Sequence, residues 1–456
     1  MNAKRMIVLA AMAAAYIANS APVTVDFDRV ICPMKPEHGV GRPPMIGINV
    51  NTMFGYLTDA GIPYSRLHDV GGWHGGNMFV DIPNVFRDFD ADENDPANYD
   101  FAFTDILMKG LVDSGVEPYY RLGVTIENFH KTKRMRTFPP RDFAKWARIC
   151  EHVIRHYTEG WANGFKYKVT YWEIWNEPDD EDGKSPMWDG TFEEYCRLYE
   201  VASKHLKARF PHLKIGGYGS AGLYKLVQKK PRPHDDYTKK CVDDFFAYVK
   251  AHGCPLDFFS VHAYDMPGAP LVPSAMQAYI GYCREGLDRI GYRTTEISMN
   301  EWLPRWTEPG SARQAALCAA LLISLQNSPA DSAMIYDGRV GTGLYSPLFS
   351  PETMKPRRAY WSMFNFNELY RLGSQTAMEG LPKDVYAVAA TDGKGVGKVF
   401  AANIGDGPAP FEMEAPRSWR LLSVHLTDVD HFNTVVAVPK ALPPNSFGVF
   451  TFIKEK

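Results

Sequence analysis

Two short acidic motifs carry the residue types in this sequence that are best suited to chemistry. The first, Trp175-Asn176-Glu177-Pro178, ends an aromatic and β-branched run, and the second is Asn300-Glu301-Trp302. Proline cannot donate a hydrogen bond to a β-ladder, so Pro178 marks the point where the first run leaves its sheet. Two carboxyl groups at the ends of two parallel strands can serve as a proton donor and a nucleophile.

This pair of carboxyl groups fits hydrolysis of a glycosidic bond with retention of configuration. That reaction needs one acid to protonate the leaving oxygen and one carboxylate to attack the anomeric carbon, roughly 5 to 5.5 Å apart. Unlike surroundings can separate the two pKa values. We expect Glu177 to be the general acid/base and Glu301 the nucleophile. Either glutamate alone would be read as a salt-bridged or solvated rim residue, and it is the pairing of the motifs that favours catalysis.

Several nearby side chains are candidates for contacts with a sugar. Asn176 can hydrogen-bond a hydroxyl beside the reacting carbon, and Trp302 can offer a flat face to a sugar ring. Arg66 and His68 alternate along a short run and should share its inward face, where a buried arginine needs a carboxylate such as a catalytic glutamate. His68 and His74 are candidates for hydroxyls of the non-reducing sugar, with packing or loop exposure as the alternative.

Two further charged residues need an interpretation. Glu173 shares strand parity with Glu177 but lies about 13 Å deeper along the strand, so we expect a core carboxylate that a neighbouring side chain satisfies. Arg305 follows the second motif closely. It can pair with a carboxylate of the substrate, which would favour a uronic acid, or it can bridge to an acidic residue at the surface.

The strands and helices that must position these residues are predicted to form an α/β protein. Short apolar or β-branched runs alternate with stretches of helical periodicity, which predicts a (β/α)8 TIM barrel, whose active site lies at the C-terminal ends of its strands. Glu177 and Glu301 would then lie on the fourth and seventh strands, across the barrel mouth. The expected strands are Met45–Val50, Pro63–Leu67, Pro118–Leu122, Thr170–Trp175, Lys214–Tyr218, Asp257–Val261, Glu296–Met299 and Ser332–Tyr336.

The chain ends outside the predicted barrel have a different character. Short alternating runs after residue 372 predict a small accessory antiparallel β-sandwich at 373–456, to which residues 21–40 would contribute a strand, leaving 41–372 for the barrel. Residues 1–20 combine a basic start with a short apolar run, which indicates a signal peptide and hence a periplasmic or secreted protein. The alternative is an N-terminal extension or a buried helix.

Composition excludes several classes of partner. A net charge of -3 and the lack of a long basic run argue against nucleic acid. Beyond residue 20, no apolar run is long enough to span a membrane. The seven cysteines are scattered, and no metal-ligand spacing is found, so we expect neither metal nor cofactor.

The glycine-rich segment 70–77 is a candidate for a wall of the active site that favours cleavage from a chain end. It is not read as a phosphate-binding loop, because no Gly-Lys-Ser/Thr follows it. The sequence gives no indication of the oligomeric state.

These motifs resemble glycoside hydrolase clan A, and the wider pattern is most similar to family 39, the family of β-xylosidases and α-L-iduronidases. By that resemblance Glu177 matches the acid/base and Glu301 the nucleophile, and His262 or Tyr264 lies where clan members hydrogen-bond the nucleophile. A satisfied core histidine and a loop tyrosine are the alternatives. The resemblance covers about 46–370 and rests on 64–69, Tyr99-Asp100-Phe101 with Asp105, 146–148, 175–178, 260–264 and 300–302.

The resemblance implies an oligosaccharide or glycoside substrate in polysaccharide degradation and leaves the sugar open. Residues 73–89 differ from the xylosidase and iduronidase patterns, so a xyloside, an L-iduronide, an arabinoside and a glucoside all remain candidates. A different class of function, a catalytically silent carbohydrate-binding barrel, would keep the cleft without turnover. The presence of both carboxylates argues against it.

Overall fold

The computed structural model describes residues 22–45, 53–70, 80–126, 137–180, 185–266 and 269–455. They form two compact units, each built from separate stretches of chain. One unit holds the N-terminal residues up to Lys35 with Thr307–Asn327 and Pro356–Lys456, and the other holds Pro36–Trp306 and Ser328–Lys355. These boundaries differ from the linear ones expected from the sequence. The predicted signal peptide lies outside the described residues, in which no helix is long and apolar enough to cross a membrane.

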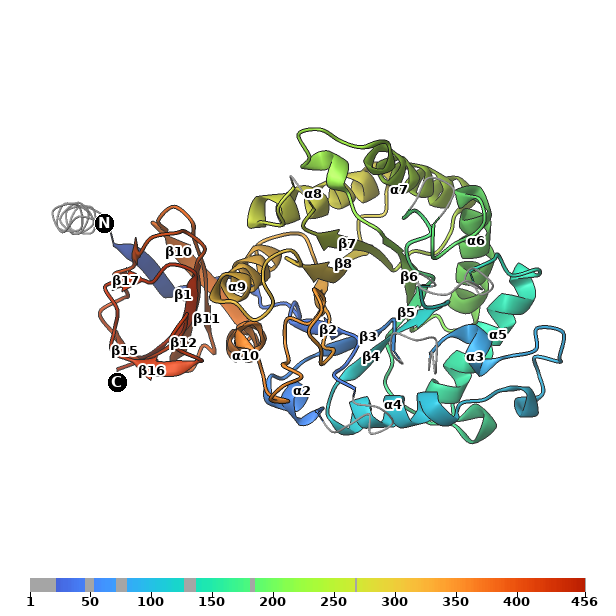
Figure 1. Ribbon diagram of the computed structural model, residues 1–456, viewed down its shortest axis with the longest axis horizontal. Coiled ribbons are helices and arrows are strands. Elements are labelled where there is room, and N and C mark those ends of the chain that lie inside the picture. Colours follow the sequence, from blue (N-terminus) through green and yellow to red (C-terminus); the bar gives the residue numbers. More distant parts are fainter. Residues whose placement is uncertain are drawn as a thin grey trace. The chain divides into compact units, whose positions relative to one another are not determined.

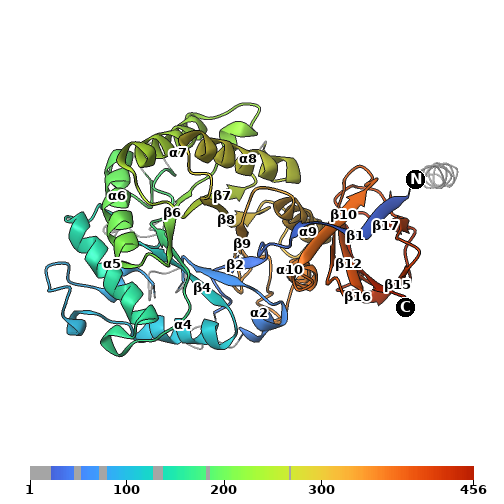
Figure 2. The same cartoon turned by 180° about the vertical axis from the view of Figure 1, so that it is seen from behind.

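The larger unit is a closed barrel of eight parallel strands, so the predicted (β/α)8 architecture is confirmed (Figure 1). Helices surround the strands, as the reverse view also shows (Figure 2). The strands are β2 (Gly39–Gly41), β3 (Tyr64–Leu67), β4 (Glu117–Leu122), β5 (Tyr171–Ile174), β6 (Lys214–Ser220), β7 (Phe258–Tyr264), β8 (Glu296–Leu303) and β9 (Ser332–Tyr336). The helices are α2 (Gly55–Asp59), α3 (Ile82–Val85), α4 (Ala102–Asp113), α5 (Phe143–Thr158), α6 (Phe192–Arg209), α7 (Pro233–His252) and α8 (Pro273–Ile290).

The first strand of the barrel is not the predicted one. β2 pairs with β3 on one side and β9 on the other and so closes the sheet, whereas residues 46–50 of the predicted strand lie outside the described residues. A Cβ on Gly39 would lie 2.8 Å from the carbonyl oxygen of Ala333, so the close approach of β9 requires glycine. A three-residue strand with glycine at both ends lacks the apolar run by which strands are recognised.

The surrounding helices begin at residues with good capping chemistry. The side chain of Asp142 accepts a hydrogen bond from the backbone N–H of Lys145 at 3.0 Å, which starts α5 where the apolar stripe at three- and four-residue intervals begins. Thr191 and Glu194 form a reciprocal capping box at the start of α6. These caps satisfy backbone donors at the helix ends that follow strands β4 and β5.

The interior of the barrel changes from apolar to charged toward the C-terminal ends of the strands. Alternate residues of a strand face the same side. Along β3 the inward positions are therefore Tyr64, Arg66 and, just beyond the strand, His68, while β5 contributes Tyr171 and then Glu173. The mostly aromatic apolar layer at the start of the strands consists of Tyr64, Tyr119, Tyr171, Phe258 and Met334. The charged layer lies above these packed side chains.

The smaller unit contains the predicted antiparallel sheet domain. Its main sheet has the order β14-β1-β10-β11-β12-β18-β15-β16, and all neighbours are antiparallel except β1 and β14. Val23, Val25 and Phe27 of β1 enter one core with residues of β11, β12, β15 and β18. The helices α9 (Ala312–Gln326) and α10 (Arg358–Tyr370) contact β11 and β12. The strands are β1 (Val23–Pro33), β10 (Ser374–Glu379), β11 (Val385–Thr391), β12 (Val396–Asn403), β13 (Ala409–Pro410), β14 (Met413–Glu414), β15 (Trp419–Thr427), β16 (Thr434–Val436), β17 (Ala441–Leu442) and β18 (Ser446–Lys454).

Candidate active site

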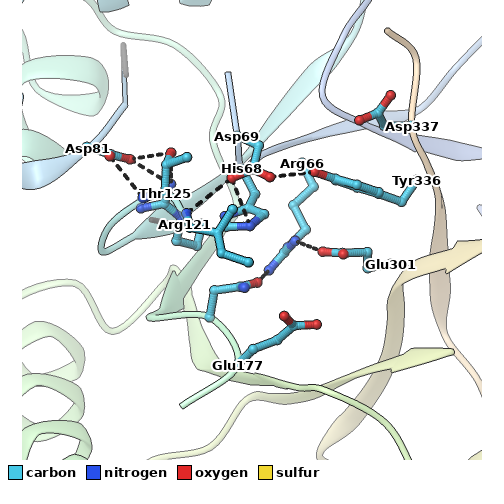
Figure 3. A network of polar contacts seen from close by, with 12 residues as sticks. Arg66, His68, Asp69, Asp81, Arg121, Thr125, Glu177, Glu301, Tyr336 and Asp337 are labelled. Carbon is cyan, nitrogen blue, oxygen red and sulfur yellow. Dashed lines mark hydrogen bonds and ion pairs between the residues drawn. The ribbon is translucent and has the colours of Figure 1, made fainter. Parts of the chain in front are cut away.

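Glu177 and Glu301 meet at the C-terminal end of the barrel. Glu177 follows β5 by three residues, and Glu301 lies in the second half of β8. A carboxylate oxygen of each, together with a ring nitrogen of His262, lies within 4.8 Å of the others. Figure 3 shows the two carboxyl groups directed toward a common space near Arg66. The structure therefore brings together the two glutamates that the sequence motifs single out.

Arg66 lies at the centre of the charged layer. Its Nε donates to Glu173 Oε2 at 2.7 Å, its Nη1 to Glu301 Oε2 at 2.9 Å and its Nη2 to Asn176 Oδ1 at 2.5 Å. Burial opposes the charge of this guanidinium, but the charges of Glu173 and Glu301 outweigh it and raise the pKa of Arg66. One cation thereby fixes Glu301 and Asn176, two of the predicted site residues.

Glu301 is held as a hydrogen-bond acceptor on both carboxylate oxygens. Oε2 accepts from Arg66, and Oε1 accepts from the hydroxyl of Tyr264, the last residue of β7. Burial raises the pKa of Glu301 to about 7, and the nearby Glu177 adds to this rise, while the charge of Arg66 and the hydrogen bond from Tyr264 act in the opposite direction. Both contacts favour the ionised form and leave the carboxylate with a fixed orientation.

Glu177 has a different environment, with no cation bonded to it. Its Oε1 makes a hydrogen bond of 2.5 Å with Nδ1 of His262, and burial lowers the pKa of His262 to about 4, so this imidazole is neutral at pH 7. Burial first, and then the charge of Asp179, raise the pKa of Glu177 to about 8. The carboxyl of Glu177 therefore stays protonated to higher pH than that of Glu301.

His262 and Tyr264 thus divide between the two glutamates. Tyr264 contacts Glu301, as the resemblance implied for a residue at this strand end, while His262 contacts Glu177 and lies 3.6 Å from Oε2 of Glu301. Both side chains are almost completely buried. The division gives each carboxyl group its own hydrogen-bond partner.

Glu173 is a core carboxylate, and its neighbours satisfy it completely. In addition to the bond from Arg66, its Oε1 accepts from Ser260 Oγ at 2.6 Å and from Asn300 Nδ2 at 2.7 Å. Its side chain has no exposed surface. It therefore positions Arg66 and Asn300, and it is inaccessible to a substrate.

Opposite Glu177, the ends of β3, β4 and β9 supply a second polar cluster (Figure 3). Nε2 of His68 lies 3.2 Å from Asp69 Oδ1, and the hydroxyl of Tyr336 donates to Asp69 Oδ2 at 2.7 Å. Burial and then the charge of Arg121 lower the pKa of His68 well below its usual range, so its ring is neutral. Arg121 in turn donates to Asp81 at 2.8 Å. A neutral histidine among hydrogen-bonding groups suits sugar hydroxyls.

Sequence reasoning did not single out Asp69, Asp81, Arg121 or Tyr336. A signal existed for Arg121, which occupies an inward position of an otherwise apolar and aromatic strand in the same way as Arg66. The signal for Asp81 was absent, because its role depends on a loop that returns to β4, where Thr125 donates to it twice.

The remaining predicted contacts have different outcomes. Asn176 uses its Oδ1 for Arg66, and its Nδ2 has no partner among the described residues, so an amide donor is left for a ligand. Trp302 is completely buried, which does not suit a platform for sugar, and the exposed indole of this segment belongs to Trp306. His74 lies outside the described residues. Arg305 donates to the hydroxyl of Tyr345 and makes no ion pair with an acidic residue of the described chain.

Within the described residues, Glu177, His262 and Glu301 form the one acidic and histidine group close enough to share a metal ion. A cation there would lie beside the guanidinium of Arg66, which already bonds Glu301 at 2.9 Å. Like charges at that separation repel in a buried pocket. The arrangement therefore fits proton transfer and nucleophilic attack better than metal binding.

Comparison with known proteins gives a consistent result. Residues 56–385 match the family model described as glycosyl hydrolases family 39. A β-xylosidase of Caldicellulosiruptor saccharolyticus is 27% identical over 236 residues, which is 50% of this chain and 42% of the relative. The match thus spans less than half of that enzyme.

Solved structures share the fold over nearly the whole chain. A glucosidase from Croceicoccus marinus superposes with a TM-score of 0.76 at 19% identity, covering 96% of this chain and all of the other. A monomeric β-xylosidase from Caulobacter crescentus superposes with a TM-score of 0.69 at 16% identity, covering 95% of this chain and all of the other. At these identities the likeness concerns the barrel and sheet architecture.

Proposed function

The chain belongs to family 39 of the glycosyl hydrolases, and we propose that it acts as a retaining, exo-acting glycosidase of the β-xylosidase type. Glycosidase activity follows from the family and from relatives such as the β-xylosidase of Caldicellulosiruptor saccharolyticus. The stereochemical course, the preference for a chain end and the sugar are the parts that we propose. No cofactor is needed for this reaction.

The single observation that carries the proposal is the spacing of the two carboxyl groups. Oxygens of Glu177 and Glu301 lie within 4.8 Å of each other, which supports direct attack, since inverting enzymes need roughly 6.5 to 9.5 Å to admit a water. In the first step Glu301 attacks the anomeric carbon while Glu177 protonates the departing oxygen. In the second step Glu177 takes a proton from water, which attacks the anomeric carbon and releases Glu301.

The assignment of the roles is supported by the partners of each carboxyl. Glu301 accepts hydrogen bonds from a guanidinium and a phenol, and both stabilise the anionic form that must attack. Glu177 has no cationic partner bonded to it, and burial raises its pKa to about 8, so it holds a proton near neutral pH. Between these two pKa values, about 7 for Glu301 and about 8 for Glu177, the nucleophile is mostly ionised while the acid is mostly protonated.

An exo-acting preference is supported by how enclosed the site is. The side chains of Glu177 and Glu301 are only 14% and 7% exposed, so the substrate must enter a pocket where His68 and Asn176 meet the terminal sugar. The names of the curated relatives favour a β-xyloside. Export to the periplasm or the medium, based on residues 1–20, would expose the enzyme to oligosaccharides from plant or host glycans.

The proposal is tested with a panel of aryl α- and β-glycosides that includes xylosides, arabinosides, L-iduronides and glucosides. Release of the phenol ranks the sugars, and proton NMR within the first turnovers identifies the anomer that forms first. We expect a β-xyloside to react fastest and the β-anomer of xylose to form first. An inverted first product would contradict the role of Glu301 as nucleophile.

Two isosteric variants separate an enzyme from a silent carbohydrate-binding barrel. Glu301→Gln is expected to lose several orders of magnitude in rate on every substrate. Glu177→Gln should lose most with poor leaving groups, which need protonation, and least with a dinitrophenol, which does not. A residual rate independent of both substitutions would mean that the hydrolysis originates from another site or a contaminant.

A further inference from the structure

The loop after β8 holds a tryptophan at the surface of the barrel rim. Trp306 has 56% of its surface exposed, more than any other tryptophan in the described part of the chain. Its backbone N–H lies 3.1 Å from both carboxylate oxygens of Asp265, the residue that follows β7. The backbone of Trp306 is thus fixed to the C-terminal ends of two barrel strands, while its ring remains open to the solvent.

Arg305 connects this tryptophan to the nucleophile. The guanidinium carbon of Arg305 lies 4.8 Å from the ring centroid of Tyr264 and 5.9 Å from that of Trp306. The hydroxyl of Tyr264 donates to Glu301. One phenol ring and one guanidinium therefore separate the exposed indole from the carboxylate that attacks the sugar, and Trp306 lies at the edge of the candidate active site.

The exposure of Trp306 indicates on which side of the scissile bond it lies. The side chains of Glu177 and Glu301 are only 14% and 7% exposed, whereas Trp306 is 56% exposed. In the proposed exo-acting site the terminal sugar lies inside, with the two glutamates, and the leaving group lies toward the solvent. Trp306 and the adjacent Arg305 are therefore on the side of the leaving group.

The guanidinium of Arg305 differs from the three buried guanidiniums of this barrel because it lacks an ion pair. Arg66, Arg121 and Arg339 each contact a carboxylate at 2.9 Å or less. No carboxylate of the described residues lies within 4.0 Å of the charged nitrogens of Arg305. Its Nη1 donates to Tyr345, its Nη2 lies 3.0 Å from the sulfur of Met266, and its Nε has no partner in the described chain. A partly buried guanidinium with no carboxylate at ion-pair distance is suited to an anionic ligand.

We propose that Arg305 and Trp306 form a leaving-group subsite that binds a ring with a flat face and an acidic substituent. This inference rests on the proposed function and adds the class of leaving group to it. The indole stacks on the face of the leaving sugar or aryl ring, and Arg305 donates to its carboxylate. Both contacts are lost once the leaving group departs, so they promote formation of the glycosyl-enzyme and leave its hydrolysis unaffected.

The test compares two leaving groups that differ in charge and little in shape. The substrates are the 4-carboxyphenyl and 4-(methoxycarbonyl)phenyl glycosides of the sugar that the wild-type protein cleaves fastest. We expect Arg305→Gln to lower kcat/KM about tenfold for the acid and less than twofold for the ester. Trp306→Ala should lower it several-fold for both, and Trp306→Phe should restore much of the loss. An equal effect of Arg305→Gln on both substrates would overturn the role of Arg305.

A second readout locates the subsite relative to the scissile bond. With a dinitrophenyl glycoside, hydrolysis of the glycosyl-enzyme limits kcat, and this constant should be the same in wild type and Trp306→Ala. Arg305→Gln is left out of this comparison, because the charge of Arg305 also acts on the pKa of Glu177, the base of that step. A fall of kcat in Trp306→Ala would mean that the indole contacts the retained sugar, which contradicts the proposal. Arg293→Gln, which removes an exposed arginine from the loop that precedes β8 at the other end of the barrel, is the matched control.

Two further measurements keep the outcomes distinct. Thermal melting of each variant shows whether it is folded, and titration calorimetry in a Glu301→Gln background measures binding of the acid and the ester without turnover. A wild-type protein that cleaves no glycoside would contradict the proposed function itself. A wild-type protein that is active, with the same acid-to-ester ratio in every variant, would contradict the leaving-group subsite alone.

Discussion

Removing the hydroxyl of Tyr264 is expected to slow catalysis through its effect on Glu301. The substitution Tyr264→Phe keeps the ring that packs against Arg305, and it deletes the donor to Glu301 Oε1. A hydrogen bond to a charged group contributes about 1.5 to 3 kcal/mol. At about 1.4 kcal/mol per factor of ten, kcat/KM should fall about 10- to 150-fold.

The same substitution should also change the pH dependence. The hydrogen bond from Tyr264 lowers the pKa of Glu301, so its loss raises that pKa, and a higher pH is then needed to ionise the nucleophile. The acidic limb of the profile of kcat/KM should therefore move to higher pH, while the basic limb, set by Glu177, stays in place. Initial rates on a 4-nitrophenyl glycoside between pH 4 and pH 10 measure both limbs.

Tyr199→Phe is the matched control for this prediction. Tyr199 is also buried, but its hydroxyl donates to the backbone carbonyl of Pro255, at 2.8 Å, away from the two glutamates. Its loss should lower thermal stability slightly and leave kcat/KM and both limbs unchanged. Equal losses of activity in the two variants, or an acidic limb that does not move in Tyr264→Phe, would refute the electrostatic role of Tyr264.

Three other perturbations have outcomes that follow from the site. Asp179→Asn removes a charge that raises the pKa of Glu177, so the basic limb of kcat/KM should shift to lower pH; an unchanged limb would argue against this coupling. Arg66→Met leaves Glu173 and Glu301 buried without their cation, and urea unfolding should report a loss of about 3 to 5 kcal/mol, whereas a gain in stability would contradict the account of the charged layer. Dialysis against a chelator should leave kcat unchanged, and a loss that zinc or calcium restores would show that the reaction needs a metal.

The sequence was sufficient to predict most of the barrel. Seven of the predicted strands overlap β3 to β9, because short apolar runs alternate with amphipathic helices such as α5. β2 could not be predicted in the same way, since its geometry is imposed by the approach of β9 to Gly39 and not by its own side chains. Tertiary contacts determine such a strand, so the local hydrophobic pattern of the sequence does not predict it.

The contacts of the site were predictable where a residue type allows only one kind of partner. A buried arginine requires a carboxylate, and the structure gives Arg66 two. Which of two partners a side chain chooses was beyond sequence reasoning. His262 and Tyr264 lie on the same face of β7, yet the histidine contacts Glu177 and the tyrosine reaches Glu301. That choice depends on tertiary geometry, which the sequence pattern does not contain.

The pairing of asparagine with glutamate in both motifs depends on breaks in strand regularity. Consecutive residues of a regular strand face opposite sides, so Asn300 and Glu301 could not both point into the barrel. The register of β8 shifts between Met299 and Trp302, and as a result Asn300 donates to Glu173 while Glu301 accepts from Arg66.

The first motif reaches the same result by a different route. Beyond the end of β5, Trp175 and Glu177 adopt φ values of 73° and 43°, in the left-handed region that non-glycine residues rarely occupy. This turn lets Asn176 accept from Arg66 while Glu177 contacts His262. Strand parity alone would have turned one member of each pair away from the barrel interior. The strained turn of the first motif directs Asn176 and Glu177 to the same site, and the bulge of the second lets Asn300 hold Glu173 while Glu301 faces the substrate.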